Sequence, residues 1–230
     1  MIKIIGFDAD DTLWHNESIF DRVQQRYRDL LARYHPADVV DRVLFATEMR
    51  NLPHYGYGVK GFMLSTVETA IELTKGAISA QEIREIITLG QEMLAHPVEL
   101  LPGVAELVPA LARDYRLLLI TKGELHHQEH KIAASGLAPH FSAIEILSEK
   151  DGATYERVLR RHGVAVGEFV MVGNSLRSDI LPVLELGGAG VHIPYHITWQ
   201  HEHVEEPPRN HARFRRVDNL AALPPLLPAL

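Results

Sequence analysis

Three acidic residues crowd the segment that follows the first apolar stretch of the chain. Residues 2–7 are short, apolar and rich in isoleucine, and Asp8, Asp10 and Asp11 come directly after them. Clustered carboxylates are costly unless a cation compensates them, and Mg²⁺ is the natural candidate. One carboxylate can then attack a phosphorus atom while another handles a proton. An isolated Asp-x-Asp pair is more often a helix cap or a solvated acidic loop than a metal site, so both interpretations stay open at this point.

Three further polar segments carry groups suited to an anion or a cation. Residues 121–123 (Thr-Lys-Gly) supply a hydroxyl and several N–H groups at a helix start, which suits anionic oxygen. Lys150 can place an ammonium beside an attacking carboxylate. Segment 173–179 offers an amide oxygen from Asn174 and a carboxylate from Asp179. Taken singly, these segments are also typical of a helix cap, a surface lysine and a strand-to-helix turn.

The candidate residues follow segments with the pattern of buried strands. Five short apolar runs are predicted strands, at residues 2–7, 116–120, 143–147, 169–172 and 190–193. Helical patterns separate the later ones, so we predict an α/β fold with a Rossmann-like parallel sheet covered on both faces. Ligands bind at the carboxyl ends of such strands. The loops 8–12, 121–123 and 173–179 should therefore converge on one cleft.

The segment after the first strand has a different pattern. Residues 15–100 show apolar side chains at helical spacing and no clear strand, and Ser79 to Glu82 forms a capping-box pattern. We predict a helical cap inserted at 15–100 into a core made of residues 1–14 and 101–230. The proline-interrupted tail, residues 220–228, predicts at most one short helix.

Composition excludes several classes of function. The 230 residues include 23 Lys and Arg against 30 Asp and Glu, a formal net charge of -7, with no long basic run and no cysteine. Nucleic acid and an anionic membrane surface are therefore disfavoured as partners, and thiol chemistry is excluded. No signal-peptide pattern or membrane-length apolar segment is present, so a cytoplasmic protein is expected. Nothing in the pattern indicates an oligomeric state.

The order of the motifs is more specific than any one of them. Asp-x-Asp-x-Thr follows the first strand, Thr follows the next, then comes Lys, and Gly-Asn-x-x-x-x-Asp follows a further strand. This combination resembles the haloacid dehalogenase-like (HAD) hydrolase superfamily over nearly the whole chain. The insert lies where that superfamily carries its helical C1 cap, and the motifs are those of its phosphatases.

The resemblance implies a role for each motif. Asp8 would be the nucleophile that forms an aspartyl-phosphate, and Asp10 the acid/base that protonates the leaving group and then activates water. Phosphate binding would fall to residues of the later loops: Thr121, Lys122 and Lys150. Lys150 would also stabilise the nucleophile, and Thr12 would support the first loop.

The implied metal site departs from the family pattern at one position. The ligands would be Asp8, the main-chain carbonyl of Asp10, Asp179 and Asn174, where many superfamily phosphatases have Asp in place of Asn174. An amide oxygen still ligates Mg²⁺ but brings no charge, so weaker metal binding is expected.

Two other segments carry candidate groups. Tyr55, Tyr57 and Lys60, in a glycine-rich stretch of the cap, are predicted to contact substrate, although a plain helix-to-helix loop is an equal alternative. Histidines recur in segment 192–203, which we interpret as solvated or locally hydrogen-bonded rather than as a transition-metal site.

The function expected from these features is Mg²⁺-dependent hydrolysis of a small phosphorylated metabolite. Two rivals remain. A metal-independent haloacid dehalogenase of the same superfamily would not need Asp10, whereas a binding module would have lost metal affinity through Asn174. The presence of Asp10 favours phosphoryl chemistry over the first rival, and the retention of the other site residues disfavours the second.

Overall fold

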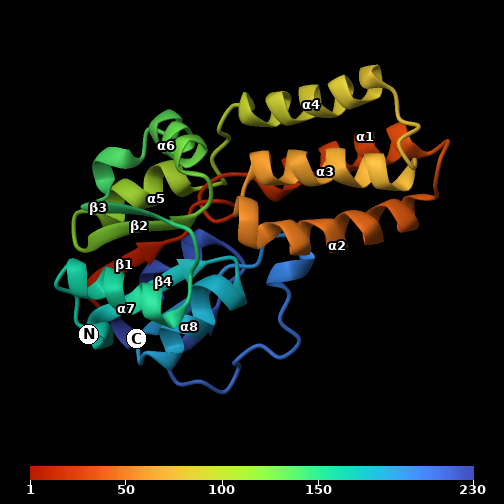
Figure 1. Ribbon diagram of the computed structural model, residues 1–230. Coiled ribbons are helices and arrows are strands. Elements are labelled where there is room, and N and C mark those ends of the chain that lie inside the picture. The colour runs from red at the N-terminus through yellow and green to blue at the C-terminus, as the bar shows by residue number, and fades with distance from the viewer. The chain divides into compact units, whose positions relative to one another are not determined.

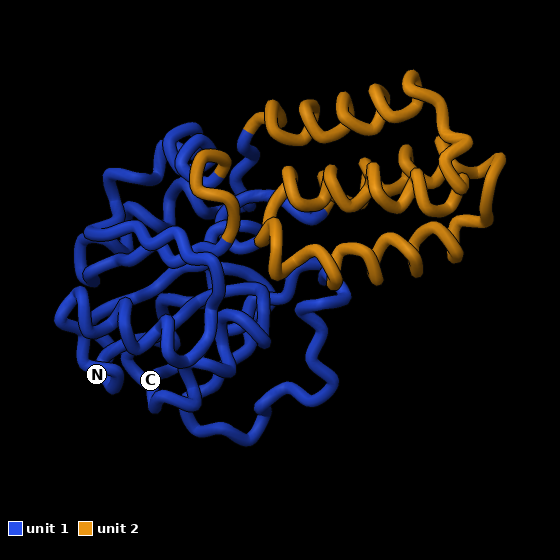
Figure 2. Tube along the Cα trace, viewed as in Figure 1, with its two compact units in different colours: residues 1–17, 98–122, 128–230 blue, residues 18–97, 123–127 orange.

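The computed structural model describes residues 1–230 and divides the chain into two compact units. Unit 1 comprises residues 1–17, 98–122 and 128–230, and unit 2 comprises residues 18–97 and 123–127 (Figure 2). The junctions found here, after residues 17 and 97, lie close to those predicted after residues 14 and 100. Residues 123–127, which the sequence places in the core, group with unit 2.

Unit 1 is built on a six-stranded parallel sheet (Figure 1). In spatial order the strands are β3 (Ala143–Leu147), β2 (Arg116–Lys122), β1 (Ile4–Phe7), β4 (Phe169–Gly173), β5 (Ala189–His192) and β6 (Phe214–Arg216). The predicted α/β fold with a parallel Rossmann-like sheet is confirmed, and five strands lie where the apolar runs predict them. The sequence does not predict β6, because three residues with two arginines make no apolar run.

The alternation of side chains along the strands separates two apolar layers. Ile5 and Phe7 of β1 belong to one layer, whereas Leu118 and Ile120 of β2 belong to the other. The helices that contribute to the first layer are α5 (Val104–Leu111) and α6 (Leu125–Ala134), and those that contribute to the second are α7 (Gly152–Arg161) and α8 (Leu181–Glu185). Both faces of the sheet are thus covered, which leaves its carboxyl edge for polar loops.

Short turns complete unit 1. A π-helical turn, Leu176–Ile180, follows β4, and 3₁₀ turns occur at Ala138–His140, Val166–Glu168, Gln200–Glu202, Leu220–Ala222 and Pro224–Ala229. The tail thus forms two 3₁₀ turns in place of the single short helix expected, because its prolines lack the N–H groups that a longer helix needs. Leu223 and Leu227 nevertheless join the first apolar layer.

Unit 2 contains four helices that share one apolar core. They are α1 (Glu17–Leu31), α2 (Ala37–Tyr55), α3 (Val59–Leu73) and α4 (Ala80–Leu94). The predicted capping box is present: the Ser79 hydroxyl accepts from the Glu82 N–H, and the Glu82 carboxylate accepts from the Ser79 N–H at 2.9 Å. These two bonds satisfy donors that the first turn of α4 would otherwise leave unpaired.

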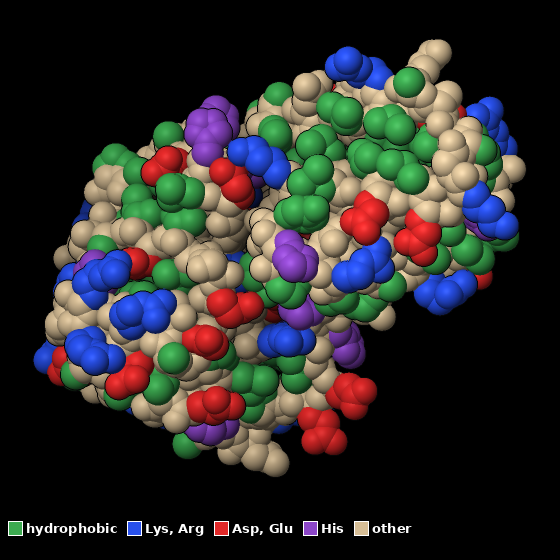
Figure 3. Space-filling view, viewed as in Figure 1, with side chains coloured by type: hydrophobic (Ala, Val, Ile, Leu, Met, Phe, Trp, Pro, Cys, Tyr) green, Lys and Arg blue, Asp and Glu red, His purple; other side chains and the backbone are tan.

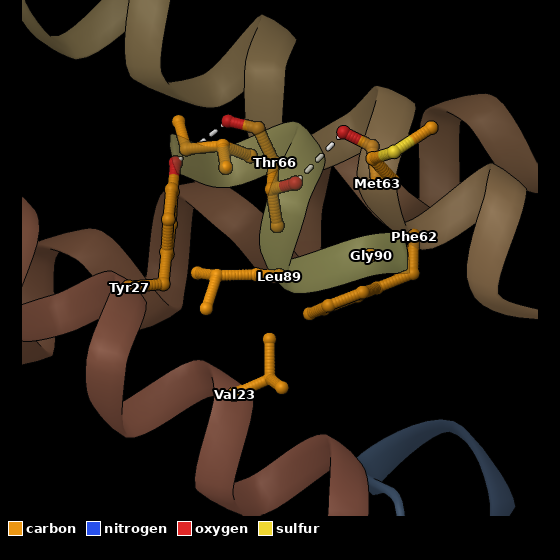
Figure 4. A pocket seen from close by; sticks show the side chains of 8 residues that line it. Val23, Tyr27, Phe62, Met63, Thr66, Leu89 and Gly90 are labelled. Atoms are coloured by element: carbon orange, nitrogen blue, oxygen red, sulfur yellow. Dashed lines mark hydrogen bonds between the residues drawn. The ribbon is translucent and has the colours of Figure 1, made fainter. Parts of the chain in front are cut away.

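A small crevice opens among α1, α3 and α4 of unit 2 (Figure 4). Its lining is Val23, Tyr27, Phe62, Met63, Thr66, Ile86, Leu89 and Gly90. The Tyr27 hydroxyl donates to the Thr66 carbonyl at 2.8 Å, and the Thr66 hydroxyl donates to the Met63 carbonyl at 2.7 Å. Because the lining is otherwise apolar and both hydroxyls are already bonded, this crevice belongs to the helix packing of unit 2 and offers no polar anchor to a ligand.

Candidate active site

The end of β1 positions the first acidic loop. The Asp8 N–H donates to the Val172 carbonyl at 2.9 Å and extends the pairing of β1 with β4. Asp8 is 7% exposed. Thr12 braces it, because the Thr12 hydroxyl donates to Asp8 Oδ2 at 3.0 Å and accepts from the Asn174 N–H at 3.1 Å. One hydroxyl therefore connects the loop after β1 with the loop after β4.

Lys150 joins two buried carboxylates. Its ammonium lies 2.5 Å from Asp8 Oδ1 and 2.7 Å from Asp179 Oδ1, and Lys150 itself is 4% exposed. Burial raises the pKa of Asp8 to about 7, while the Lys150 charge acts in the opposite direction and Asp179 adds to the rise. The predicted juxtaposition of Lys150 with the candidate nucleophile is therefore present in the structure.

The amide of Asn174 faces two oxygen atoms of the loop after β1. One atom of this amide is 3.2 Å from Asp8 Oδ2 and 3.2 Å from the Asp10 carbonyl oxygen. With nitrogen in that position, the amide donates to both oxygens. With oxygen there, three oxygen atoms face one another, an arrangement that a cation stabilises. When the amide oxygen faces the other two, the donor set of carboxylate, carbonyl and amide oxygens fits Mg²⁺.

Asp179 takes part in two fixed interactions beside this donor set. Its Oδ2 accepts from the Ser175 N–H at 3.0 Å, and its Oδ1 accepts from Lys150. Remaining lone pairs on both oxygens are available to a metal. No three His, Cys, Asp or Glu side chains form a metal cluster on their own. The predicted ligand set of Asp8, Asp10, Asn174 and Asp179 stays a prediction that depends on carbonyl and amide oxygens.

The Asp10 carboxylate is held by a different set of partners. Lys131 lies 2.6 Å from its Oδ1 and 2.7 Å from its Oδ2, the Trp14 indole donates to Oδ1 at 2.6 Å, and Gln128 donates to Oδ2 at 3.2 Å. Burial raises the pKa of Asp10, but the charge of Lys131 and these hydrogen bonds outweigh it and hold the pKa below its usual range. Asp10 is therefore kept as a carboxylate.

Sequence reasoning missed Trp14, Gln128 and Lys131. A signal for two of them exists in the sequence. Gln128 and Lys131 stand three residues apart on α6, the helix that follows Thr121 in the chain, so their side chains lie on the same face of that helix. Gln128 Nε2 donates to the Thr121 hydroxyl at 2.7 Å. That bond uses Thr121 as an acceptor and leaves its own O–H to donate elsewhere, as binding an anionic oxygen requires.

Lys122 is paired with acidic and hydroxyl side chains in the structure. Its ammonium contacts Glu202 at 2.5 Å, Ser178 at 2.9 Å and Glu149 at 3.6 Å. Its binding of phosphate stays a prediction. Asp11, the third acidic residue of the cluster, accepts the N–H groups of Asn16 and Glu17 at 2.8 to 3.0 Å.

The predicted specificity residues of the cap lie in unit 2. Tyr55 is 50% exposed, and Lys60 forms an ion pair with Glu124 at 3.2 Å. Glu124 belongs to the 123–127 segment that follows the Thr121 loop in the chain. Their contact with substrate, like that of Tyr57, stays a prediction.

Two hydrogen bonds connect the histidine-rich segment to other loops of unit 1. His192 bonds through Nε2 to the Asn174 carbonyl at 2.9 Å, and burial lowers the pKa of His192. His15 Nδ1 lies 2.6 Å from the Tyr195 hydroxyl.

Charged side chains of both signs lie on the face of the molecule shown in Figure 3. There, Lys and Arg side chains alternate with Asp and Glu side chains over both units. No helix has the length and apolar composition needed to cross a bilayer.

The parallel sheet and the acidic loop at its carboxyl edge define a hydrolase of the haloacid dehalogenase-like class. The family model of haloacid dehalogenase-like hydrolases matches residues 2–187. The chain belongs to this family, as its motifs predict.

Three proteins illustrate the relationship. A haloacid dehalogenase-like family hydrolase from Xanthomonas campestris is 45% identical, with a TM-score of 0.88 over 99% of this chain and 91% of that one. N-acylneuraminate-9-phosphatase from Rattus norvegicus is 27% identical over 197 residues, 81% of this chain and 79% of the relative. The 2-haloacid dehalogenase from Pseudomonas syringae is 22% identical, with a TM-score of 0.63 over 99% of both chains, and shares the fold.

Proposed function

We propose that this enzyme hydrolyses a small phosphomonoester with the help of Mg²⁺, through an aspartyl-phosphate formed on Asp8. The observation that carries the proposal is the separate environment of two carboxylates two residues apart. Asp8 lies between Lys150 and Thr12 at 2.5 and 3.0 Å, whereas Asp10 lies against Lys131. Asp8 is thus held beside the Lys150 ammonium, whereas Asp10 has a separate environment that suits acid/base work.

The residues divide the reaction between them. The Asp8 carboxylate attacks phosphorus and the alcohol leaves with a proton from Asp10. Water, deprotonated by Asp10, then attacks phosphorus and releases Asp8. Bound Mg²⁺ would supply positive charge against the carboxylates and the phosphate. Lys150 and the Thr121 hydroxyl hold phosphate oxygens.

Asp10 must carry a proton in the first step, although Lys131 favours its ionised form. An arriving phosphate brings negative charge close to Asp10, which favours protonation. Once the alcohol has left, the ionised form that Lys131 stabilises is the base that the second step needs.

The phosphatase assignment is supported further by its relatives. The curated relatives are N-acylneuraminate-9-phosphatases, which by name act on a phosphorylated small molecule. The dehalogenase likeness concerns the fold alone, and the elaborate support of Asp10 favours a reaction that needs an acid/base.

The decisive experiment measures phosphate release from p-nitrophenyl phosphate with and without Mg²⁺. Wild type should be active only with Mg²⁺, and Asp8→Asn should be inactive because the amide cannot attack phosphorus. Asp114→Asn, an exposed Asp-to-Asn change in unit 1, serves as the matched control and should behave as wild type. Substantial activity in Asp8→Asn would disprove the nucleophile, and halide release from 2-haloacids would instead identify a dehalogenase.

A further inference from the structure

One carboxylate outside the family motifs joins two loops of the candidate active site. Glu202 ends the 3₁₀ turn Gln200–Glu202, in the long connection between β5 and β6, and its side chain is 12% exposed. Its Oε1 lies 2.5 Å from the Lys122 ammonium, and its Oε2 accepts from Ser175 at 2.5 Å and from Ser178 at 2.6 Å. Both carboxylate oxygens are thus occupied.

The charge of Glu202 is well compensated. Burial opposes its ionisation, but Lys122 and the two serine hydroxyls hold the pKa of Glu202 at about 2. Three donors around one largely buried carboxylate make a polar network in which each member depends on the others. Loss of the carboxylate charge would leave the Lys122 ammonium, 14% exposed, without its main counter-ion.

The partners of Glu202 are sequence neighbours of the residues that the mechanism uses. Lys122 follows Thr121 directly at the end of β2, and Ser178 precedes Asp179 in the turn after β4. Lys122 also donates to the Ser178 hydroxyl at 2.9 Å. A single carboxylate therefore ties the loop expected to bind phosphate to the loop expected to bind metal.

A second bond fastens the Glu202 turn to the same loop. Arg177 Nη1 donates to the His201 carbonyl at 2.8 Å. The Ser175 hydroxyl that donates to Glu202 also accepts the Ser178 N–H at 3.0 Å, so the carboxylate reaches the cap of the π-helical turn itself. The turn that carries Asp179 is therefore held by its own N-terminal cap and by bonds to the 3₁₀ turn of Glu202.

We propose that Glu202 is a positioning residue for this site, which fixes the spacing between the Thr121 hydroxyl and the Asp179 carboxylate through Lys122 and Ser178. We call this ion pair between Glu202 and Lys122, with the bonds of Glu202 to Ser175 and Ser178, the clamp. The inference rests on the proposed function, because the spacing matters only if Thr121 binds phosphate and Asp179 binds the metal.

The test is Glu202→Gln, which keeps an oxygen to accept the serine hydroxyls and removes the charge that holds Lys122. Glu206→Gln, an identical change at an exposed position of the same connection, is the control. Calorimetric titration of the protein with Mg²⁺ should give an affinity about tenfold or more weaker in Glu202→Gln, as for other residues that orient metal ligands, and unchanged in Glu206→Gln. The value of kcat should fall in parallel, with a smaller change in KM.

A double variant separates positioning from a general loss of stability. If Glu202 acts through Lys122, then Glu202→Gln combined with Lys122→Met should bind Mg²⁺ no more weakly than the weaker single variant, because both remove one interaction. Additive losses would contradict a shared clamp.

Hydrogen exchange in the Mg²⁺-free protein gives a readout that needs neither metal nor turnover. Amides of residues 121–123 and 175–180 should exchange faster in Glu202→Gln than in wild type or Glu206→Gln. Unchanged exchange and unchanged Mg²⁺ affinity, even with a lower melting temperature, would overturn the inference. Failure of wild type to hydrolyse any phosphomonoester would instead count against the proposed function, because the affinity and exchange measurements use no substrate.

Discussion

At the scale of single residues, the site distinguishes two carboxylates that stand two positions apart. Burial raises the pKa of Asp8 to about 7, whereas Lys131 and its neighbours hold the pKa of Asp10 below the usual range. Two acidic groups whose environments separate their pKa values are typical of a division between nucleophile and acid/base. The sequence supplies the pair, and the side chains around each member make them different.

Lys131→Met should shift the pH dependence of the reaction. Without the ammonium, the pKa of Asp10 rises, by about one to three units for the loss of an adjacent opposite charge. The protonated acid that the first step needs then persists to higher pH, so the basic limb of kcat/KM, which reports that step, should move to higher pH. The measurement is a pH profile of p-nitrophenyl phosphate hydrolysis, with Lys131→Arg as the charge-preserving control. An unmoved limb in Lys131→Met would show that Lys131 does not set this ionisation.

At the scale of elements, the site depends on how closely β4 approaches the turn that follows it. A Cβ on Gly173, at the end of β4, would lie 2.2 Å from Asp179 Oδ2 and 2.7 Å from Asp179 Cβ. No side chain fits between them, so the missing Cβ of Gly173 lets the Asp179 carboxylate rest directly against the strand.

Gly173→Ala should therefore damage the site more than the fold. The added methyl must displace Asp179 and with it the contact to Lys150, so Mg²⁺ affinity and kcat should each fall by about tenfold or more. Gly152→Ala is the matched control, because a Cβ on Gly152 meets no atom within 4 Å. Equal activity of the two variants by steady-state assay would argue against Asp179 as a ligand.

At the scale of the whole molecule, acidic groups outnumber basic groups among the largely buried side chains at the sheet edge. The acidic groups there are Asp8, Asp10, Asp11, Asp179 and Glu202, and the basic groups paired with four of them are Lys122, Lys131 and Lys150. The chain as a whole is also acidic, with a formal net charge of -7. A divalent cation at this edge should stabilise the folded chain, because it reduces the repulsion among these carboxylates, which exists only when the chain is folded.

Mg²⁺ should accordingly raise the melting temperature of wild type. At a hundredfold excess over Kd the stabilisation is about 2.7 kcal/mol, which corresponds to about 5 to 10 °C for a chain of this size. Calorimetry with NaCl at equal ionic strength is the control for screening. Asp8→Asn should lose most of the shift, and an equal shift in that variant would place the cation elsewhere.

The sequence alone was enough for the parallel sheet and for the order of the motifs. Apolar runs that each end in a polar loop are a local pattern, and local patterns predict strands and the edge at which their loops meet. The short strand β6 was not predicted, because Arg215 and Arg216 interrupt the apolar pattern on which the prediction of strands depends. The juxtaposition of Asp8 with Lys150 followed from the family resemblance, and the structure has it.

Only the tertiary structure decided which partner each charged group takes. Lys122 pairs with Glu202, and Asp10 pairs with Lys131, across 80 and 121 positions of the chain. Such pairings depend on where loops from different strands meet and on which groups they bury, and neither is encoded in the spacing of a motif. The sequence determined the candidate catalytic groups, whereas packing determined their environment, because burial and neighbouring charge set a pKa and both exist only in the folded chain.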